Sequence, residues 1–352
     1  MDKEPLAFLE KLIAAPSPSG FEQPAQKVMR EEMARHADSV RTDVHGNVIA
    51  VLNPDAPLRM MLAGHVDEIG LMIRNINDGG YLYCAAIGGV EPMVAVGQRV
   101  TIHSAKGPVP GVIGRRPIHL AEKDEAEKAP KIHQLWVDIG AKNRKDAEKL
   151  VAVGDPITFD AGLQLLRNDL AAARGFDDRM GSFVVSETLR KLKGKKLAVA
   201  VYGVSTVQEE VGLRGARTSA FGIDPHAGIA IDVGHATDCP DVDKNRVGDF
   251  RCGKGPIVAR GANINPVLYD MIVDAAKKAK IPIQIEGVPG GTGTDANAIQ
   301  VNRAGVAAGL VSVPCRYMHT PCEVISLKDL DQASSLLAAL LARMPAAVDF
   351  TP

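Results

Sequence analysis

Cysteine and aromatic residues are scarce in this 352-residue chain. The five cysteines are odd in number and form no CxxC pair, which argues against a disulfide framework and against a thiolate zinc site. Aromatic residues make up 4% of the sequence, with a single tryptophan, so few rings are available to stack against sugars. The thiol content indicates a reducing compartment, and we expect the protein to be cytoplasmic.

Long apolar runs and an excess of one charge are also missing. No stretch approaches the roughly 20 apolar residues of a membrane-spanning helix, and the opening residues MDKEP lead into a charged segment rather than a secretory signal. Lysine and arginine total 41 against 42 for aspartate and glutamate, so no basic footprint for nucleic acid exists. We expect neither a membrane nor a nucleic acid as partner.

Apolar periodicity predicts alternating helices and strands in both outer parts of the chain. The expected helices are 5–15, 21–36, 182–192, 266–279 and 327–344, and the expected strands are 47–52, 59–63, 197–205, 228–232 and 305–314. This rhythm is typical of an α/β domain in which helices cover a largely buried sheet.

The middle of the chain has a different sequence pattern, with short β-prone segments separated by glycine. Strands are expected at 81–83, 98–103, 110–113, 135–139 and 156–159. Because α/β patterning flanks this region on both sides, we expect residues 69–162 to form an inserted β domain. The catalytic α/β domain would then be discontinuous, comprising residues 1–68 and 163–352.

Five polar segments lie at or close to the ends of expected strands, where α/β proteins place ligands. Taken singly, each is more often a capped turn, a helix N-cap or a solvated acidic turn. The segments are Gly64-His65-Val66-Asp67-Glu68, Gly175-Phe176-Asp177-Asp178-Arg179, Val207-Gln208-Glu209-Glu210, Ile231-Asp232-Val233-Gly234-His235 and Arg316-Tyr317-Met318-His319.

Two of these segments suggest specific roles. His65 and Asp67 point to the same side of an extended backbone, and a metal-bound imidazole usually donates its second N–H to such a carboxylate. Glu209 and Glu210 diverge if the backbone stays extended, so that one binds metal while the other accepts a proton beside the substrate.

The paired aspartates suggest a cation. Asp177 and Asp178 repel each other unless positive charge is close, and a cation on one with Arg179 on the other would supply it. The glycine-rich loop at 290–295 lacks the ending of a nucleotide-binding P-loop. We expect it to lead into a helix near Asp295, along the substrate cleft, while His235 is a candidate for a supporting role beside Asp232.

Together the five segments offer His, Asp, Glu, Asp and His, a set of nitrogen and oxygen ligands without thiolates. Such ligands suit zinc, cobalt or manganese. Five are too many for one catalytic zinc with an open position, but they fit two metals that share a bridging carboxylate. Such a pair can hold a hydroxide and polarise a carbonyl, which predicts hydrolysis.

These segments, and others in the inserted region, resemble the tetrahedral (TET) aminopeptidases, a family that includes glutamyl and deblocking aminopeptidases. The resemblance covers nearly the whole chain in order. The matching segments are AGHVDEIGLMI (Ala63–Ile73), GVIGRRPIHL (Gly111–Leu120), DIGAKNRKDAEKL (Asp138–Leu150), VGDPITFD (Val153–Asp160), GFDDRMG (Gly175–Gly181), TVQEEVGLRGA (Thr206–Ala216), AIDVGHATD (Ala230–Asp238), PGGTGTDA (Pro289–Ala296) and RYMHTPCEVI (Arg316–Ile325).

The resemblance implies a metal-dependent aminopeptidase that releases N-terminal residues from peptides with a free N-terminus. It implies two divalent ions, zinc first with cobalt or manganese as alternatives, and a mixed-sheet peptidase domain with an inserted barrel-like domain that drives dimerisation into a dodecamer. The implied site has one metal on His65, Asp177 and Asp232, the other on Asp177, Glu210 and His319, Glu209 as general base and Asp67 orienting His65.

Other functions stay open at this stage. A metal-dependent N-acyl amino acid deacylase would use the same dinuclear chemistry. A glycosidase needs two opposed carboxylates about 5 to 10 Å apart, which adjacent glutamates do not supply if they diverge. A scaffolding protein with a vestigial site is the third alternative, and the intact ligand set argues against it.

Overall fold

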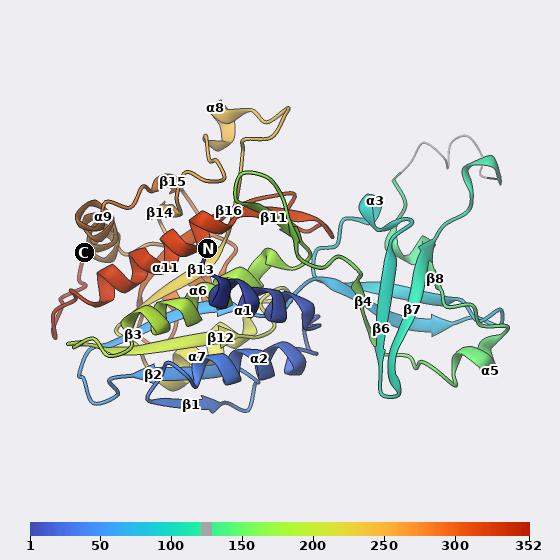
Figure 1. The fold of residues 1–352 in the computed structure, drawn as a ribbon, viewed down its shortest axis with the longest axis horizontal. Coiled ribbons are helices and arrows are strands. Elements are labelled where there is room, and N and C mark those ends of the chain that lie inside the picture. The colour runs from blue at the N-terminus through green and yellow to red at the C-terminus, as the bar shows by residue number, and fades with distance from the viewer. Residues whose placement is uncertain (121–128) are drawn as a thin grey trace.

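A mixed sheet and a separate closed barrel organise the fold (Figure 1). The computed structural model describes residues 1–120 and 129–352. The sheet belongs to an α/β unit built from both outer parts of the chain, and the barrel stands to one side of it (Figure 1). The predicted fold class, an α/β domain with an added all-β domain, is confirmed.

The 11-stranded sheet has the order β1-β2-β12-β3-β13-β16-β17-β11-β10, with β14 on β16 and β15 on β14. Its central strands β12, β3, β13 and β16 are parallel, so their carboxyl ends meet at one edge. The strands are β1 (Ser39–Thr42), β2 (Val48–Leu52), β3 (Arg59–His65), β10 (Gln164–Leu165), β11 (Leu170–Ala173), β12 (Ala200–Thr206), β13 (Ala227–His235), β14 (Ile257–Gly261), β15 (Gln284–Val288), β16 (Ala307–Arg316) and β17 (Glu323–Ser326).

Alternating side chains of the central strands are buried on both faces of the sheet. On β3, Met60 and Leu62 pack into the larger core, while Met61 and Ala63 pack into a second core on the opposite face. The larger core is covered by α1 (Lys3–Ala14), α2 (Gln23–Met33), α6 (Phe176–Leu192), α9 (Pro266–Ala279) and α11 (Leu327–Leu341), and the second by α7 (Arg214–Ile223) and α10 (Asp295–Gln300).

The barrel closes in the order β4-β5-β8-β7-β6-β9 around its own apolar core. Its first and last strands are neighbours, with Leu71 of β4 opposite Ile157 of β9. The barrel strands are β4 (Gly70–Ile76), β5 (Leu82–Ile87), β6 (Arg99–Ser104), β7 (Gly107–Gly114), β8 (Trp136–Asp138) and β9 (Pro156–Phe159). All of them lie within 69–162, and the domain boundaries themselves stay a prediction.

Short elements complete the described chain. They are α3 (Pro92–Ala95), α5 (Arg144–Ala147), α8 (Lys244–Val247) and the 3-10 turns Ile118–Leu120 and Ile132–Gln134. None of the helices in residues 1–120 and 129–352 combines the length and the apolar character that crossing a bilayer requires.

Every expected helix and strand overlaps an element of the structure, although several boundaries differ. The expected helix 266–279 coincides with α9 and the expected strand 156–159 with β9, whereas the helix expected at 21–36 ends at Met33. Strand β13 continues beyond the expected 228–232 to His235. The amphipathic helix α7 and the edge strands β1 and β10 had no prediction.

Candidate active site

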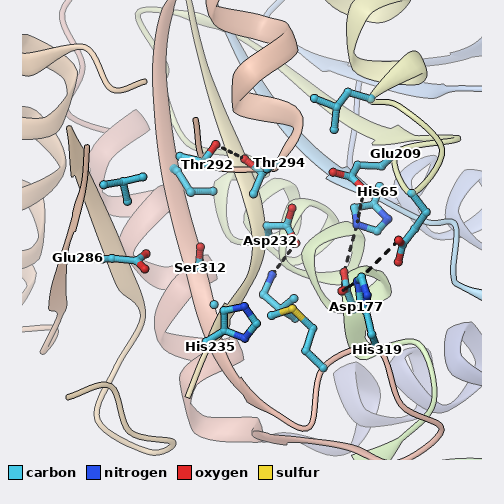
Figure 2. A pocket seen from close by; sticks show the side chains of 18 residues that line it. His65, Asp177, Glu209, Asp232, His235, Glu286, Thr292, Thr294, Ser312 and His319 are labelled. Atoms are coloured by element: carbon cyan, nitrogen blue, oxygen red, sulfur yellow. Dashed lines mark hydrogen bonds and ion pairs between the residues drawn. The ribbon is translucent and has the colours of Figure 1, made fainter. Parts of the chain in front are cut away.

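A cavity of about 460 Å³ opens at the edge where the parallel strands end. All the residues expected to bind metal, together with Glu209, line it (Figure 2). His65 ends β3, Asp232 lies on β13, and Asp177 stands in the first turn of α6. The strand ends therefore bring together side chains that are far apart in sequence, as the topology of an open α/β sheet predicts.

The potential ligands form two groups. One consists of His65, Glu209 and Asp232, and the other of Asp177, Glu210 and His319. Within each group, one ligand atom from each residue lies within 4.8 Å of the others. Both groups contain one imidazole and two carboxylates, the donor types that divalent transition metals prefer.

Asp177 stands between the two groups. Its Oδ1 lies 3.2 Å from Nε2 of His65, and its Oδ2 lies 3.3 Å from Nε2 of His319. Burial acts to raise the pKa of Asp177, but the two imidazoles outweigh it and hold this pKa well below its usual range. One carboxylate thus presents a different oxygen to each group, the arrangement that a bridging ligand requires.

Asp67 is fully buried and holds the surrounding backbone. Its Oδ1 accepts the N–H of Glu209 over 3.0 Å, and its Oδ2 accepts the N–H of Glu210 over 3.2 Å and the hydroxyl of Ser19 over 2.7 Å. Its Oδ1 and backbone oxygen lie 3.4 and 3.1 Å from Nδ1 of His65. Nδ1 therefore faces Asp67, which leaves Nε2 directed toward the pocket.

The adjacent glutamates point to different groups. Oε2 of Glu209 lies 3.7 Å from Nε2 of His65, and Oε2 of Glu210 lies 3.7 Å from Nε2 of His319. Sequence reasoning expected this divergence from an extended backbone. The structure achieves it with a turn instead, in which Gln208 has a left-handed φ of 56°.

Buried negative charge dominates the pocket. Burial, reinforced by Asp295 and opposed by His65, raises the pKa of Glu209 to about 8. Burial and the charge of Asp177 raise the pKa of Glu210 to about 8 as well. Burial also raises the pKa of Asp232 well above its usual range. Buried carboxylates of this kind are costly unless cations compensate them.

The chemistry of the donor set fits two divalent cations. Two imidazoles face four carboxylates in the two ligand groups, which leaves an excess of negative charge. In addition, Oε1 of Glu210 is buried and receives no hydrogen bond from the described residues. A metal ion would satisfy both the excess charge and this unpaired oxygen, whereas a hydrogen-bond donor alone would satisfy only the second.

Two further carboxylates position the ligands: Asp178, one of the paired aspartates, and Glu323, for which there was no sequence-based prediction. Glu323, on β17, accepts the N–H of Asp177 over 2.9 Å and the N–H of His319 over 3.0 Å. Asp178 accepts the N–H of His65 over 3.0 Å and that of Gly181 over 3.0 Å. An isolated glutamate starting a short strand carries no recognisable pattern, so only the fold reveals the contribution of Glu323.

The expectation that Arg179 would neutralise one of the paired aspartates is wrong. Arg179 is fully buried, pairs with Glu68 and donates to the carbonyl of Ile13 over 2.6 Å. Asp178 relies on backbone N–H donors instead. The reason is that the side chains point in different directions. The Arg179 guanidinium lies against α1 and Glu68, whereas both aspartates contact His65 at the end of β3.

The remaining expectations concern the rim of the pocket. Thr292, Gly293 and Thr294 line the cavity, and α10 starts at Asp295, so the loop borders the cleft as expected. His235 also lines the cavity but belongs to neither ligand group. Sequence reasoning missed Glu286 of β15, which lines the cavity on the side away from the ligand groups (Figure 2).

Comparison with known proteins identifies the chain. A family model described as M42 glutamyl aminopeptidase matches residues 46–336. The chain belongs to the M42 family. This family membership, with the relatives below, makes it a metal-dependent aminopeptidase, and the resemblance to TET aminopeptidases is confirmed. The M42 family implies divalent metals, in agreement with the donor set of the pocket.

The relatives of this M42 aminopeptidase match it over nearly its full length. Lysyl aminopeptidase of Pyrococcus furiosus is 39% identical over 349 residues, covering 98% of this chain and 99% of that protein. The structure of a TET aminopeptidase from Thaumarchaeota archaeon SCGC AB-539-E09 has a TM-score of 0.93 at 35% identity, covering 97% of each chain. The TET1 peptidase of Pyrococcus horikoshii, which can assemble into a tetrahedron or a large octahedral shell, has a TM-score of 0.87 at 31% identity, covering 97% of this chain and 100% of that one.

Proposed function

We propose that this M42 aminopeptidase uses two divalent ions, one held by His65, Asp177 and Asp232 and the other by Asp177, Glu210 and His319, with Glu209 as general base. The observation that carries this proposal is the position of Asp177, whose two oxygens lie 3.2 and 3.3 Å from two different imidazoles. A single-metal site would not need a carboxylate shared in this way.

The chemistry of the site divides between the ions and the protein. When bound, the two ions supply a polarised scissile carbonyl and a water of lowered pKa. Glu209 takes the proton of the attacking water and passes it to the leaving amine, as a positioned carboxylate does in general acid–base catalysis. Asp67 fixes the orientation of His65 and the backbone of Glu209, so it acts by positioning.

The proposed metal ligands favour substrates with a free N-terminus. Glu210 and Asp232 lie with the other ligand residues at one end of the pocket. A free α-amine could ligate a divalent ion held there, whereas the amide nitrogen of an N-acyl group could not. This difference favours the aminopeptidase over the alternative N-acyl amino acid deacylase.

The metal identity, assembly and location belong to the same proposal. Zinc is the proposed metal, with cobalt and manganese as alternatives, because imidazole and carboxylate ligands suit all three. We propose a homo-oligomer, a dodecamer assembled from dimers formed through the barrel, supported by the assembly of the Pyrococcus horikoshii relative. A cytoplasmic location is supported by the five cysteines, which are all free.

The test of this function is a metal-depletion assay. The protein is stripped with a chelator, and release of N-terminal residues from free-amine and N-acetylated substrates is measured before and after addition of zinc, cobalt or manganese. Restored activity on free-amine substrates alone supports the proposal. Activity confined to acylated substrates would move the protein to the deacylases, and sugar hydrolysis that survives metal removal would favour the glycosidase.

A further inference from the structure

Glu286 places a second negative charge in the pocket, away from the ligand groups. It lies on β15, and Figure 2 shows it on the far side of the cavity from His65 and Asp177, directed into the space beside Ser312. The side chain is half-buried. The pocket therefore has a metal-binding end and, at the opposite wall, a separate carboxylate that the proposed mechanism does not use.

The carboxylate of Glu286 lacks a partner within the described protein. No residue of 1–120 or 129–352 donates a hydrogen bond to it or forms an ion pair with it. Burial raises its pKa, and the attraction of His235 opposes this rise only in part. A half-buried carboxylate without a protein partner would be stabilised by a positively charged group of a bound ligand.

The wall between the two ends suits an aliphatic chain. Val288, two residues from Glu286 on β15, lines the cavity, and so do Leu310, Val233 and Met318. Among the described lining residues there is no lysine and no arginine. A side chain that reaches from the metal-binding end to Glu286 therefore finds apolar groups in the cavity and a carboxylate at its far wall, which suits the aliphatic stem and charged head of lysine and arginine.

We propose that Glu286 determines specificity by pairing with the cationic side chain of an N-terminal lysine or arginine. This inference rests on the proposed function, since it requires the substrate's α-amine to lie at the metal-binding end. It also requires that N-terminal glutamate and aspartate are poor substrates, although the family model carries the description glutamyl aminopeptidase. No lysine or arginine among the described lining residues would receive their side-chain carboxylate, and Glu286 would repel it.

The experiment compares lysyl, arginyl, norleucyl and glutamyl substrates with the metal-loaded enzyme and its Glu286→Gln and Glu286→Lys variants. Norleucine keeps the stem of lysine without the ammonium group, so the lysyl-to-norleucyl ratio of kcat/KM isolates the charge. We expect the natural chain to favour lysine and Glu286→Gln to lower this ratio about 10- to 100-fold, typical of a lost charge-assisted hydrogen bond. Glu286→Lys should shift preference toward the glutamyl substrate.

Glu10→Gln, an exposed substitution on α1, is the matched control and should leave the ratio unchanged. A lysyl-to-norleucyl ratio near one in the natural chain, or an equal loss on all substrates in Glu286→Gln, would overturn the role of Glu286. Either result leaves the aminopeptidase itself standing, because norleucyl substrate is still hydrolysed. Failure of the natural chain on every free-amine substrate would instead count against the proposed function.

Discussion

Glu323 accepts a hydrogen bond from the backbone N–H of Asp177 over 2.9 Å. Its other oxygen accepts the N–H of His319 over 3.0 Å. Strand β17 therefore fixes the backbone of the proposed bridging carboxylate and of one proposed imidazole ligand at the same time. Because Glu323 itself is buried, both hydrogen bonds are shielded from water and strengthened.

Replacement of Glu323 with alanine should weaken metal binding about 10- to 100-fold, the usual effect of removing a group that orients metal ligands. Glu323→Gln retains one carbonyl acceptor and should lose less. Metal affinity is measured by competition with a chromophoric chelator, and thermal unfolding of the metal-free proteins checks that both variants fold. Unchanged affinity in a folded Glu323→Ala protein would contradict the positioning role.

Glu209→Gln should separate catalysis from metal binding. The amide cannot accept the proton of the attacking water, so kcat should fall by about two to four decades, while the metal content stays at two ions per subunit. Turnover and metal analysis on the same preparation test this. Loss of a metal ion together with activity would instead make Glu209 a ligand, as its grouping with His65 and Asp232 allows.

Asp177→Asn and Asp232→Asn should differ in metal stoichiometry. Asp177 faces both imidazoles, so its amide variant should weaken both sites, whereas Asp232 belongs to one group only. Metal titration should therefore show two weakened sites in Asp177→Asn and one in Asp232→Asn. Two intact sites in Asp177→Asn would exclude the bridging assignment.

The stability of the metal-free protein should fall as pH rises. The pKa of Glu209 and Glu210 is raised from 4.5 to about 8, and that of His319 from 6.5 to about 9. In each case the folded protein holds a proton that the unfolded chain has released, so the free energy of unfolding decreases with pH. The stabilisation from His319 is complete below pH 6.5 and is lost as pH passes about 9.

The measurement is the melting temperature of chelator-treated protein between about pH 6 and 9, the window given by these shifts. It should decline across this range, and saturating zinc should reverse most of the decline because cations stabilise the charged carboxylates. The same titration on Glu209→Gln serves as control and should show a shallower slope. A melting temperature that rises over this window would contradict the charge balance described for the pocket.

Assembly through the barrel should be sensitive to its exposed apolar residues. Ile118 and Leu120 are 68% and 72% exposed and lie between β7 and β8. Replacing both with aspartate should dissociate the oligomer into smaller species, measured by size-exclusion chromatography with light scattering. Val44→Asp, at an exposed position outside the barrel strands, is the control. An intact assembly in the double variant would count against this face of the barrel as the contact.

Local patterns predicted much of this structure because several elements are long and strongly periodic, as α9 and α11 illustrate. Several residues of the site could also be predicted, since His65 ends β3 and Asp232 ends the expected strand 228–232. The roles of Glu323 and Glu286 could not be predicted in this way. Each is a single acidic residue in a short strand, and its importance depends on which distant strand lies beside it, which only the assembled sheet decides.

Arg179 illustrates a different limit of sequence reasoning. Its neighbours in sequence, Asp177 and Asp178, made it their obvious partner, yet it pairs with Glu68 from a distant segment. Charge complementarity predicts that a buried guanidinium has an acidic partner but not which one. The choice follows from the direction of the chain at the start of α6, where the backbone of Asp177 and Asp178 is not yet helical.

The chain enters the barrel through β4 and leaves it through β9, and these two strands are paired, with Leu71 opposite Ile157. Glu68, just before the barrel, forms an ion pair with Arg174, which follows the barrel. A module whose two ends meet in this way can be gained, exchanged or lost during evolution without rerouting the rest of the chain. His65 and Asp67 lie immediately before this junction and Asp177 soon after it. The proposed metal ligands and the barrel that would govern assembly are therefore joined at the same junction. A mutation at this junction would affect both the active site and the oligomer, so selection on one constrains the other.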